Sequence, residues 1–332
     1  MKPELPLVSL RGLKTSFPVR KGVFQRTVGQ VKAVAGVDLE IRRGETLGLV
    51  GESGCGKTTL GKTLLQLTKA SEGQILYDFD GVQKDLCQLS VREMDEARRK
   101  LQIVFQDPYS SLNPAFTIFG SLEDPLRRFG VHKRADRRRI VGDLLEQVNM
   151  KADYMDRYPN EFSGGQRQRI GIARALCVNP ELLVCDEAVS ALDVSIRAQV
   201  LNLLLRLKQE RGLTYVFITH DLSVVEYISD RIAVMYLGKI VELADAVDLY
   251  RGALHPYTLA LLSAVPVANL DHVKNRIVLG GDVPSPVNPP SGCPFHPRCA
   301  HRLARCETEA PQLKKHVING HDHSVACHLI QE

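Results

Sequence analysis

The sequence predicts an α/β fold built around a largely parallel β-sheet. Three short apolar runs, 46–50, 182–185 and 214–219, have the length and composition of strands that are buried on both faces. Helical patterns lie between them, including 195–210, whose apolar residues fall on one face. Strands that alternate with helices favour parallel pairing, because each crossover helix returns the chain to the same end of the sheet.

The segments around these runs complete the expected order of elements. We expect a strand at 31–41, hairpins at 74–81 and 232–243, and amphipathic helices at 89–101 and 133–149. The second hairpin is expected to turn at Gly238. Beyond residue 265 proline, histidine and cysteine replace the alternating pattern, so we expect a small appended region with little regular structure.

The composition of the chain limits the classes of protein that it can represent. Its 332 residues are 44% hydrophobic and 24% charged, which excludes a disordered chain and a small disulfide scaffold. No apolar run approaches the ~20 residues that a membrane-spanning helix needs, and residues 1–10 lack the apolar core of a signal peptide. We therefore expect a cytosolic protein whose contact with a membrane comes through a partner. The net charge of +5 does not identify a partner.

A phosphate-binding loop is the strongest local signal. Gly51–Thr58 fits the pattern G-x-x-x-x-G-K-[ST] and lies between a predicted strand and a helical pattern. Glycines let backbone N–H groups turn toward phosphate oxygens, and the following helix directs its positive end at the same charge. Lys57 supplies a cation for the outer phosphates, and the Thr58 hydroxyl is a ligand for Mg²⁺. The alternative is a glycine-rich turn without a ligand.

Two later motifs suit the same chemistry. Phe162–Arg169 opens a predicted helix, with Ser163 placed to cap it and glycines that permit close approach of a ligand. Asp186 and Glu187 end a buried strand; the first is suited to hold Mg²⁺ through water, and the second to act as a general base. The structural alternatives are a plain capped helix and a solvated turn.

In this order the motifs resemble those of ATP-binding-cassette (ABC) ATPases over about residues 5–250. The segments that carry the resemblance are Gly51–Thr58, Ser163–Gln166, Asp186–Glu187, Ser190–Asp193 and His220. The resemblance implies a P-loop NTPase (RecA-like) parallel sheet core with an antiparallel β subdomain and a helical subdomain at about 108–180. It leaves 251–332 as a C-terminal domain that contains four cysteines.

The resemblance also implies a role for each matched position. Glu187 is the base, His220 contacts the γ-phosphate, and Gln106 touches Mg²⁺ and senses the transport partner. Phe17 resembles the aromatic residue that stacks on adenine, with Phe24 as its rival across an expected long loop. The implied nucleotide-binding residues are Phe17, Gly51, Ser53, Gly54, Cys55, Gly56, Lys57, Thr58, Thr59, Gln106, Ser163, Gly164, Gly165, Gln166, Asp186 and Asp193. The implied Mg²⁺ ligands are Thr58, Gln106 and Asp186.

Two cassettes complete each ATP site in this family. ATP lies between the Lys57 loop of one cassette and the Ser163 helix of the other, and Asp193 communicates across the interface between them. All expected residues are present, so we expect a chain that hydrolyses ATP. Ala188 departs from the family, which usually has proline after the base. Proline restricts the backbone of the preceding residue, so its absence removes one restraint on Glu187.

Further segments resemble the peptide-importer group, the oligopeptide and dipeptide permease ATPases, and its second ATPase in particular. They are 108–114, 158–162, 189–195, 255–258 and 261–263. This resemblance implies a heterodimer with a paralogous ATPase, two membrane permeases and an extracytoplasmic solute-binding protein, at the cytoplasmic face of the plasma membrane. Dipeptides, oligopeptides, nickel, glutathione or sugars remain open as the solute.

Two other functions were weighed against import. A soluble ABC ATPase that acts on DNA should carry long heptads between Lys57 and Ser163, and one that acts on ribosomes should carry two cassettes; neither feature is present, and we expect no nucleic-acid partner. A non-enzymatic metal-binding regulator would leave the ATP motifs unexplained.

Four cysteines, Cys293, Cys299, Cys306 and Cys327, crowd the last forty residues. In a cytosolic chain such a group suggests a metal or cluster before it suggests disulfides. The spacing contains no C-x2-C pair, so zinc, an iron–sulfur cluster and free thiols all stay open. The resemblance to importer ATPases associates this pattern with a [4Fe-4S] cluster of structural role, with zinc as the alternative.

Overall fold

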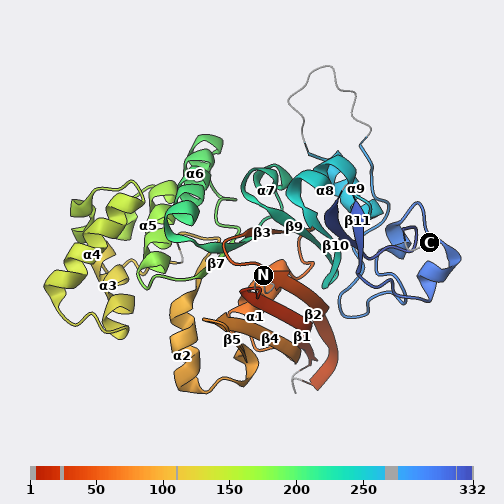
Figure 1. The fold of residues 1–332 in the computed structure, drawn as a ribbon, viewed down its shortest axis with the longest axis horizontal. Coiled ribbons are helices and arrows are strands. Elements are labelled where there is room, and N and C mark those ends of the chain that lie inside the picture. The colour runs from red at the N-terminus through yellow and green to blue at the C-terminus, as the bar shows by residue number, and fades with distance from the viewer. Residues whose placement is uncertain (1–4, 23–25, 110, 266–275, 319, 331–332) are drawn as a thin grey trace. The chain divides into compact units, whose positions relative to one another are not determined.

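The computed structural model describes residues 5–22, 26–109, 111–265, 276–318 and 320–330. They divide into two compact units (Figure 1), one built from Met1–Gln88 with Thr219–Glu332 and the other from Leu89–Ile218. Both combine β-strands with helices, which confirms the α/β class. Among the described residues, no helix is both long enough and apolar enough to cross a bilayer.

An antiparallel sheet opens the first unit, in the strand order β2-β1-β4-β5 (Figure 1). Its strands are β1 (Val8–Lys21), β2 (Arg26–Ile41), β4 (Glu72–Phe79) and β5 (Val82–Asp85), followed by the 3₁₀ turn Leu86–Gln88. The predicted hairpin at 74–81 is confirmed. The long loop expected after Phe17 is wrong, because β1 pairs with β2 and Phe17 lies opposite Val31. Polar residues on both faces of these strands hid the alternation that signals a strand.

A second sheet in the first unit carries the phosphate-binding loop. Within this unit its strand order is β3-β9-β10-β12-β11, with β3 and β9 parallel and the others antiparallel. The strands are β3 (Thr46–Val50), β9 (Arg231–Tyr236), β10 (Lys239–Asp245), β11 (Lys314–Ile318) and β12 (His321–Val325). The helices are α1 (Lys57–Leu64), α7 (Leu222–Ile228), α8 (Ala246–Gly252) and α9 (Pro256–Ser263).

The tail contains more regular structure than expected. β11 and β12 form a hairpin, and β12 pairs with β10, Leu243 lying opposite Ser324. β11 begins with two lysines and a histidine, and β12 contains two histidines and an aspartate, so no apolar alternation marks these strands in the sequence. One proline of the region beyond residue 265, Pro266, lies outside the described residues. Two 3₁₀ turns, η4 (His296–Arg298) and η5 (Ala304–Glu307), lie among the cysteines.

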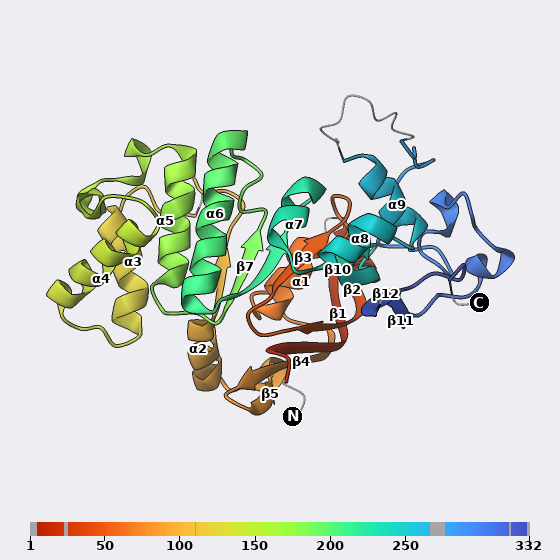
Figure 2. The same ribbon diagram turned by 45° about the horizontal axis from the view of Figure 1, so that its top comes forward.

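The second unit contains the parallel strands β6, β7 and β8. It also contains most of the long helices (Figure 2). Every residue of β7 and β8 is buried, as their continuous apolar sequences predict. The strands are β6 (Leu101–Val104), β7 (Leu182–Asp186) and β8 (Thr214–Ile218). The helices are α2 (Val91–Lys100), α3 (Ile118–Arg128), α4 (Arg134–Gln147), α5 (Gly164–Leu176) and α6 (Val194–Arg211), with 3₁₀ turns at Ala152–Asp156 and Pro159–Glu161.

Candidate functional site

The phosphate-binding loop, Gly51–Thr58, joins β3 to α1 and fits tightly against its own unit. A Cβ atom on Gly51 would lie 2.2 Å from the carbonyl oxygen of Met235, and one on Gly56 would lie 2.0 Å from that of Ala33. Gly56 also has φ 107°, which side chains rarely adopt. Gly56 is the N-cap of α1 and no side chain caps this helix, so its first N–H groups turn toward the loop.

The side chain of Lys57 folds back over this loop. Its Nζ donates to the carbonyl oxygens of Gly51 at 2.7 Å and Glu52 at 2.9 Å, and it lies 3.7 Å from the Sγ of Cys55. Lys57 is buried, and its positive charge lies at the start of α1. Burial raises the pKa of Cys55, so this thiol stays protonated and packs within the loop.

Glu52 is a residue that the sequence analysis missed, since it occupies one of the variable positions of the motif. Its backbone N–H donates to the Tyr257 hydroxyl at 2.8 Å, and its carboxylate accepts two hydrogen bonds from Arg298. Tyr257 lies in 255–258, one of the segments that carry the resemblance to the peptide-importer group. For Arg298 the only signal was its position beside Cys299.

Two other predicted nucleotide residues lie in this unit. The backbone N–H of Thr219 donates to the carbonyl of Leu49 in β3 at 3.3 Å, which places the next residue, His220, beside the strand that leads into the loop. Phe17 is 41% exposed and pairs with Val31, two residues before Ala33, whose carbonyl contacts Gly56. Its rival Phe24 lies outside the described residues.

In the second unit the predicted base and the predicted Mg²⁺-sensing glutamine contact each other. Gln106 Nε2 donates to Glu187 Oε2 at 2.8 Å, across 81 residues of sequence. Asp186 precedes Glu187 as the last residue of β7 and is buried. Two of the three predicted Mg²⁺-contacting residues, Gln106 and Asp186, therefore lie at one end of this parallel sheet, while Thr58 belongs to the other unit.

Several hydrogen bonds hold the backbone of Glu187 despite the alanine that follows it. Its φ is 48°, in the left-handed region. Its N–H donates to Ile218 at 2.9 Å, and its carbonyl accepts from the N–H and the hydroxyl of Ser190 at 3.1 and 2.9 Å. These hydrogen bonds restrain the backbone of Glu187, as a proline in place of Ala188 would be expected to do.

The second glycine motif begins α5 with a capping box. The Ser163 hydroxyl accepts from the backbone N–H of Gln166 at 3.4 Å, and the Gln166 side chain accepts from the N–H of Ser163 at 3.0 Å. Ser163 is exposed, and Gly164 follows as the first helical residue. Gly165 is buried against α6, where a Cβ would lie 2.4 Å from Ile196. Asp193 is the exposed N-cap of α6.

The four tail cysteines surround one region of the first unit without disulfide bonds. Cys293, Cys306 and Cys327 are buried and Cys299 is partly exposed. Burial, the largest cause, together with the other three thiols nearby, raises the pKa of Cys293 to about 11. Among the described side chains, Asp245, Asp248 and His321 form a group whose metal-ligating atoms all lie within 4.8 Å of one another, and this group contains no cysteine.

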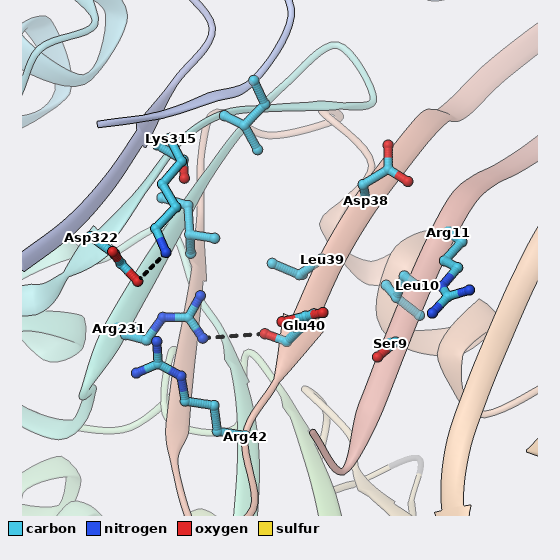
Figure 3. Close-up of a pocket in the computed structure, with 13 residues that line it drawn as sticks. Ser9, Leu10, Arg11, Asp38, Leu39, Glu40, Arg42, Arg231, Lys315 and Asp322 are labelled. Carbon is cyan, nitrogen blue, oxygen red and sulfur yellow. Dashed lines mark hydrogen bonds and ion pairs between the residues drawn. The ribbon is translucent and has the colours of Figure 1, made fainter. Parts of the chain in front are cut away.

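A pocket of about 350 Å³ in the first unit contains none of the predicted site residues (Figure 3). Two of its cationic side chains have acidic partners. Lys315 contacts Asp322 at 2.7 Å, and Arg231 contacts Glu45 at 3.2 Å and donates to the carbonyl of Glu40 (Figure 3). We assign no ligand to this pocket.

Two family descriptions match the chain. Residues 34–190 match the family described as ABC transporter, and residues 241–306 match the oligopeptide/dipeptide transporter C-terminal region. The chain is 52% identical to the oligopeptide transport ATP-binding protein AppF of Bacillus subtilis over 97% of each chain. It is 50% identical to a putative peptide import ATP-binding protein of Brucella ovis over 96% of each.

Solved structures agree with these sequence relationships. The dimeric post-hydrolysis state of the ATP-binding cassette MJ0796, bound to ADP and Pi, has a TM-score of 0.62 and 29% identity, covering 72% of this chain and 98% of that one. CbiO1 of Clostridium perfringens, part of the ABC transporter complex CbiONQ, has a TM-score of 0.62 and 25% identity, covering 75% and 92%. These matches confirm the resemblance drawn from the motifs: the chain belongs to the ATP-binding proteins of ABC transporters that carry the oligopeptide/dipeptide transporter C-terminal region.

Proposed function

We propose that this chain is the ATP-hydrolysing subunit of an importer for peptides, attached peripherally at the cytoplasmic face of the membrane. The observation that carries this proposal is the 52% identity to an oligopeptide transport ATP-binding protein over 97% of both chains. The match of residues 241–306 to a transporter-specific C-terminal region supports it. We take 5–250 as the ATPase domain, with a helical subdomain at about 108–180, and 251–332 as the C-terminal domain.

Hydrolysis would proceed by attack of water on the γ-phosphate. Glu187 would polarise the water, and its hydrogen bond to Gln106 holds the carboxylate in one orientation. Lys57 and the N–H groups at the start of α1 would bind the phosphates, and His220 would contact the γ-phosphate. The oxygen ligands of Thr58, Gln106 and Asp186 suit Mg²⁺, which neutralises phosphate charge when bound. Phe17 would stack on adenine.

Partner subunits would complete the transporter. The exposed start of α5 at Ser163 and the exposed Asp193 are suited to face the nucleotide and the surface of a second, paralogous cassette. Two permeases would dock on the helical subdomain near Gln106, and an extracytoplasmic binding protein would deliver the peptide. ATP binding would close the two cassettes, and hydrolysis would release them.

The four cysteines would hold a [4Fe-4S] cluster. Four thiol side chains that converge, three of them buried, fit such a group. Zinc is the alternative, since four thiolates suit that ion as well. Bound there, the cluster would cross-link η4, η5 and the end of β12.

The variant Glu187→Gln tests the hydrolytic mechanism. In the assembled transporter we expect it to bind ATP normally and to lower turnover about 10²- to 10⁴-fold, the range of general-base catalysis. Glu181→Gln in the same unit is a matched control, since that carboxylate pairs with Lys100 instead. Turnover equal to wild type would remove Glu187 from the role of base.

Metal analysis tests the cluster. Anaerobically purified protein should be brown and contain about four irons per chain, and Cys306→Ser should lose colour and iron together. A colourless preparation with one zinc per chain would establish the alternative instead.

A further inference from the structure

Arg298 links the cysteine-containing tail to the phosphate-binding loop, 246 residues away in sequence. Its Nη1 donates to Glu52 Oε2 at 2.6 Å and its Nη2 donates to Glu52 Oε1 at 3.0 Å. The side chain of Arg298 is 7% exposed and that of Glu52 is 27% exposed. Two parallel bonds between a guanidinium and a carboxylate form the strongest geometry that this pair can adopt, and burial protects it from solvent screening.

Glu52 transmits this contact to the part of the loop that binds phosphate. Its N–H donates to Tyr257, its carbonyl accepts from Lys57, and its carboxylate accepts from Arg298. Three groups of one residue are thus held by three different segments. The loop has one further tether, because the N–H of Gly238 donates to the carbonyl of Cys55 at 2.9 Å.

The turn that carries Arg298 is itself fixed from both sides. Arg298 ends η4, and its N–H donates to the carbonyl of Phe295 at 3.0 Å. Phe295 is 1% exposed, and its ring packs 5.3 Å from that of Tyr236 and 5.4 Å from that of Tyr257. Cys293 and Cys299 flank the turn.

We propose that Arg298 is a positioning residue for ATP binding, which neutralises Glu52 and holds the phosphate-binding loop in its binding conformation. The carboxylate of Glu52 belongs to the same loop that must accept a triphosphate of like charge. Pairing with Arg298 offsets the repulsion between this carboxylate and the triphosphate. The inference rests on the proposed binding of ATP by Gly51–Thr58, and it makes the folded tail a determinant of nucleotide affinity.

The experiment measures binding of a fluorescent ATP analogue to the full-length chain, purified anaerobically. Arg298→Gln should raise the dissociation constant at least tenfold, because it leaves the Glu52 carboxylate unpaired beside the phosphates. Adding Glu52→Gln to that variant should return the constant to within threefold of wild type. Arg298→Lys keeps the charge but loses the paired geometry, and should give an intermediate value. Arg302→Gln, an exposed arginine in the same region, is the matched control.

Hydrogen exchange gives a second readout that does not depend on turnover. Amides of residues 51–57 should exchange faster in Arg298→Gln and Arg298→Lys than in wild type. If Arg298→Gln does not fold, Arg298→Lys carries the test through both readouts. A dissociation constant within twofold of wild type for the arginine variants, or a double variant no better than Arg298→Gln, would overturn the inference. Failure of the wild-type chain to bind the analogue would instead count against the proposed function.

Discussion

Two helix starts in this protein, both proposed to face a nucleotide, are built in opposite ways. At α5 the residues that cap the helix, Ser163 and Gln166, are three positions apart and bond to each other. At α1 the N-cap is Gly56, which offers no side chain. Residues far along the chain hold the loop before it, among them Arg298 and Tyr257.

The difference predicts which substitutions should disturb each helix start. A capping box is a local structure, so a change there affects one helical turn and costs little. The phosphate-binding loop depends on tertiary contacts with β2, β9 and the tail, so changes at any of these reach it. Three predictions test this contrast, and the smallest expected effect comes last.

Gly56→Ala should lower ATP affinity more than 100-fold, equivalent to about 2.8 kcal/mol at 1.4 kcal/mol per tenfold. The new Cβ would lie 2.0 Å from Ala33 O, so the loop or β2 must move. Gly36→Ala is the matched control, because Gly36 lies outside the loop and also has positive φ, while a Cβ there meets nothing within 4 Å. Binding measurements that give equal losses for the two variants would show that the contact with β2 is unimportant.

Low pH should weaken the tertiary contacts that hold the phosphate-binding loop, through the protonation of His255. Burial lowers the pKa of His255 to about 4 from the ordinary 6.5, so the folded protein holds it neutral while the unfolded chain becomes protonated below about 6.5. Unfolding free energy contributed by this residue is therefore present above pH 6.5 and is lost as pH falls toward 4. At about 1.4 kcal/mol per pH unit the total is about 3 kcal/mol.

His255 bears on the comparison because its Nδ1 accepts from the N–H of Tyr257, the residue that anchors Glu52. In urea titrations at several pH values, His255→Asn should flatten the loss of stability below pH 6.5, since asparagine caps without titrating. His132→Asn, at an exposed histidine, should leave the profile unchanged. An unaltered slope in His255→Asn would contradict the assignment.

Ser163→Ala should have the smallest effect, a loss of about 1 kcal/mol of unfolding free energy from the missing cap. Ser163→Asp should keep that stability, because aspartate also caps helices well. Faster hydrogen exchange should be confined to residues 164–167 in the alanine variant. Exchange that spreads through the second unit would show that this helix start is not local after all.

The predictable parts of the site were those whose residues are adjacent in sequence. Gly51–Thr58 and Ser163–Gln166 carry their own glycines and caps, and Asp186 with Glu187 ends a continuous apolar strand. The contact between Gln106 and Glu187 was not predictable, because 81 residues separate them and no periodicity relates their segments. The hairpin formed by β11 and β12 was not predictable because its strands are polar, and β12 is stabilised by pairing with β10, a strand distant in the sequence.

By itself the sequence determined the α/β class, the buried strands and the order of the nucleotide motifs, since each depends on the chemistry of neighbouring residues. Only the tertiary structure decided that Arg298 meets Glu52, that Tyr257 anchors the phosphate loop, and that Phe17 lies on a strand rather than in a loop. These contacts join residues that are distant in the chain, so they exist only after the core has folded and brought them together.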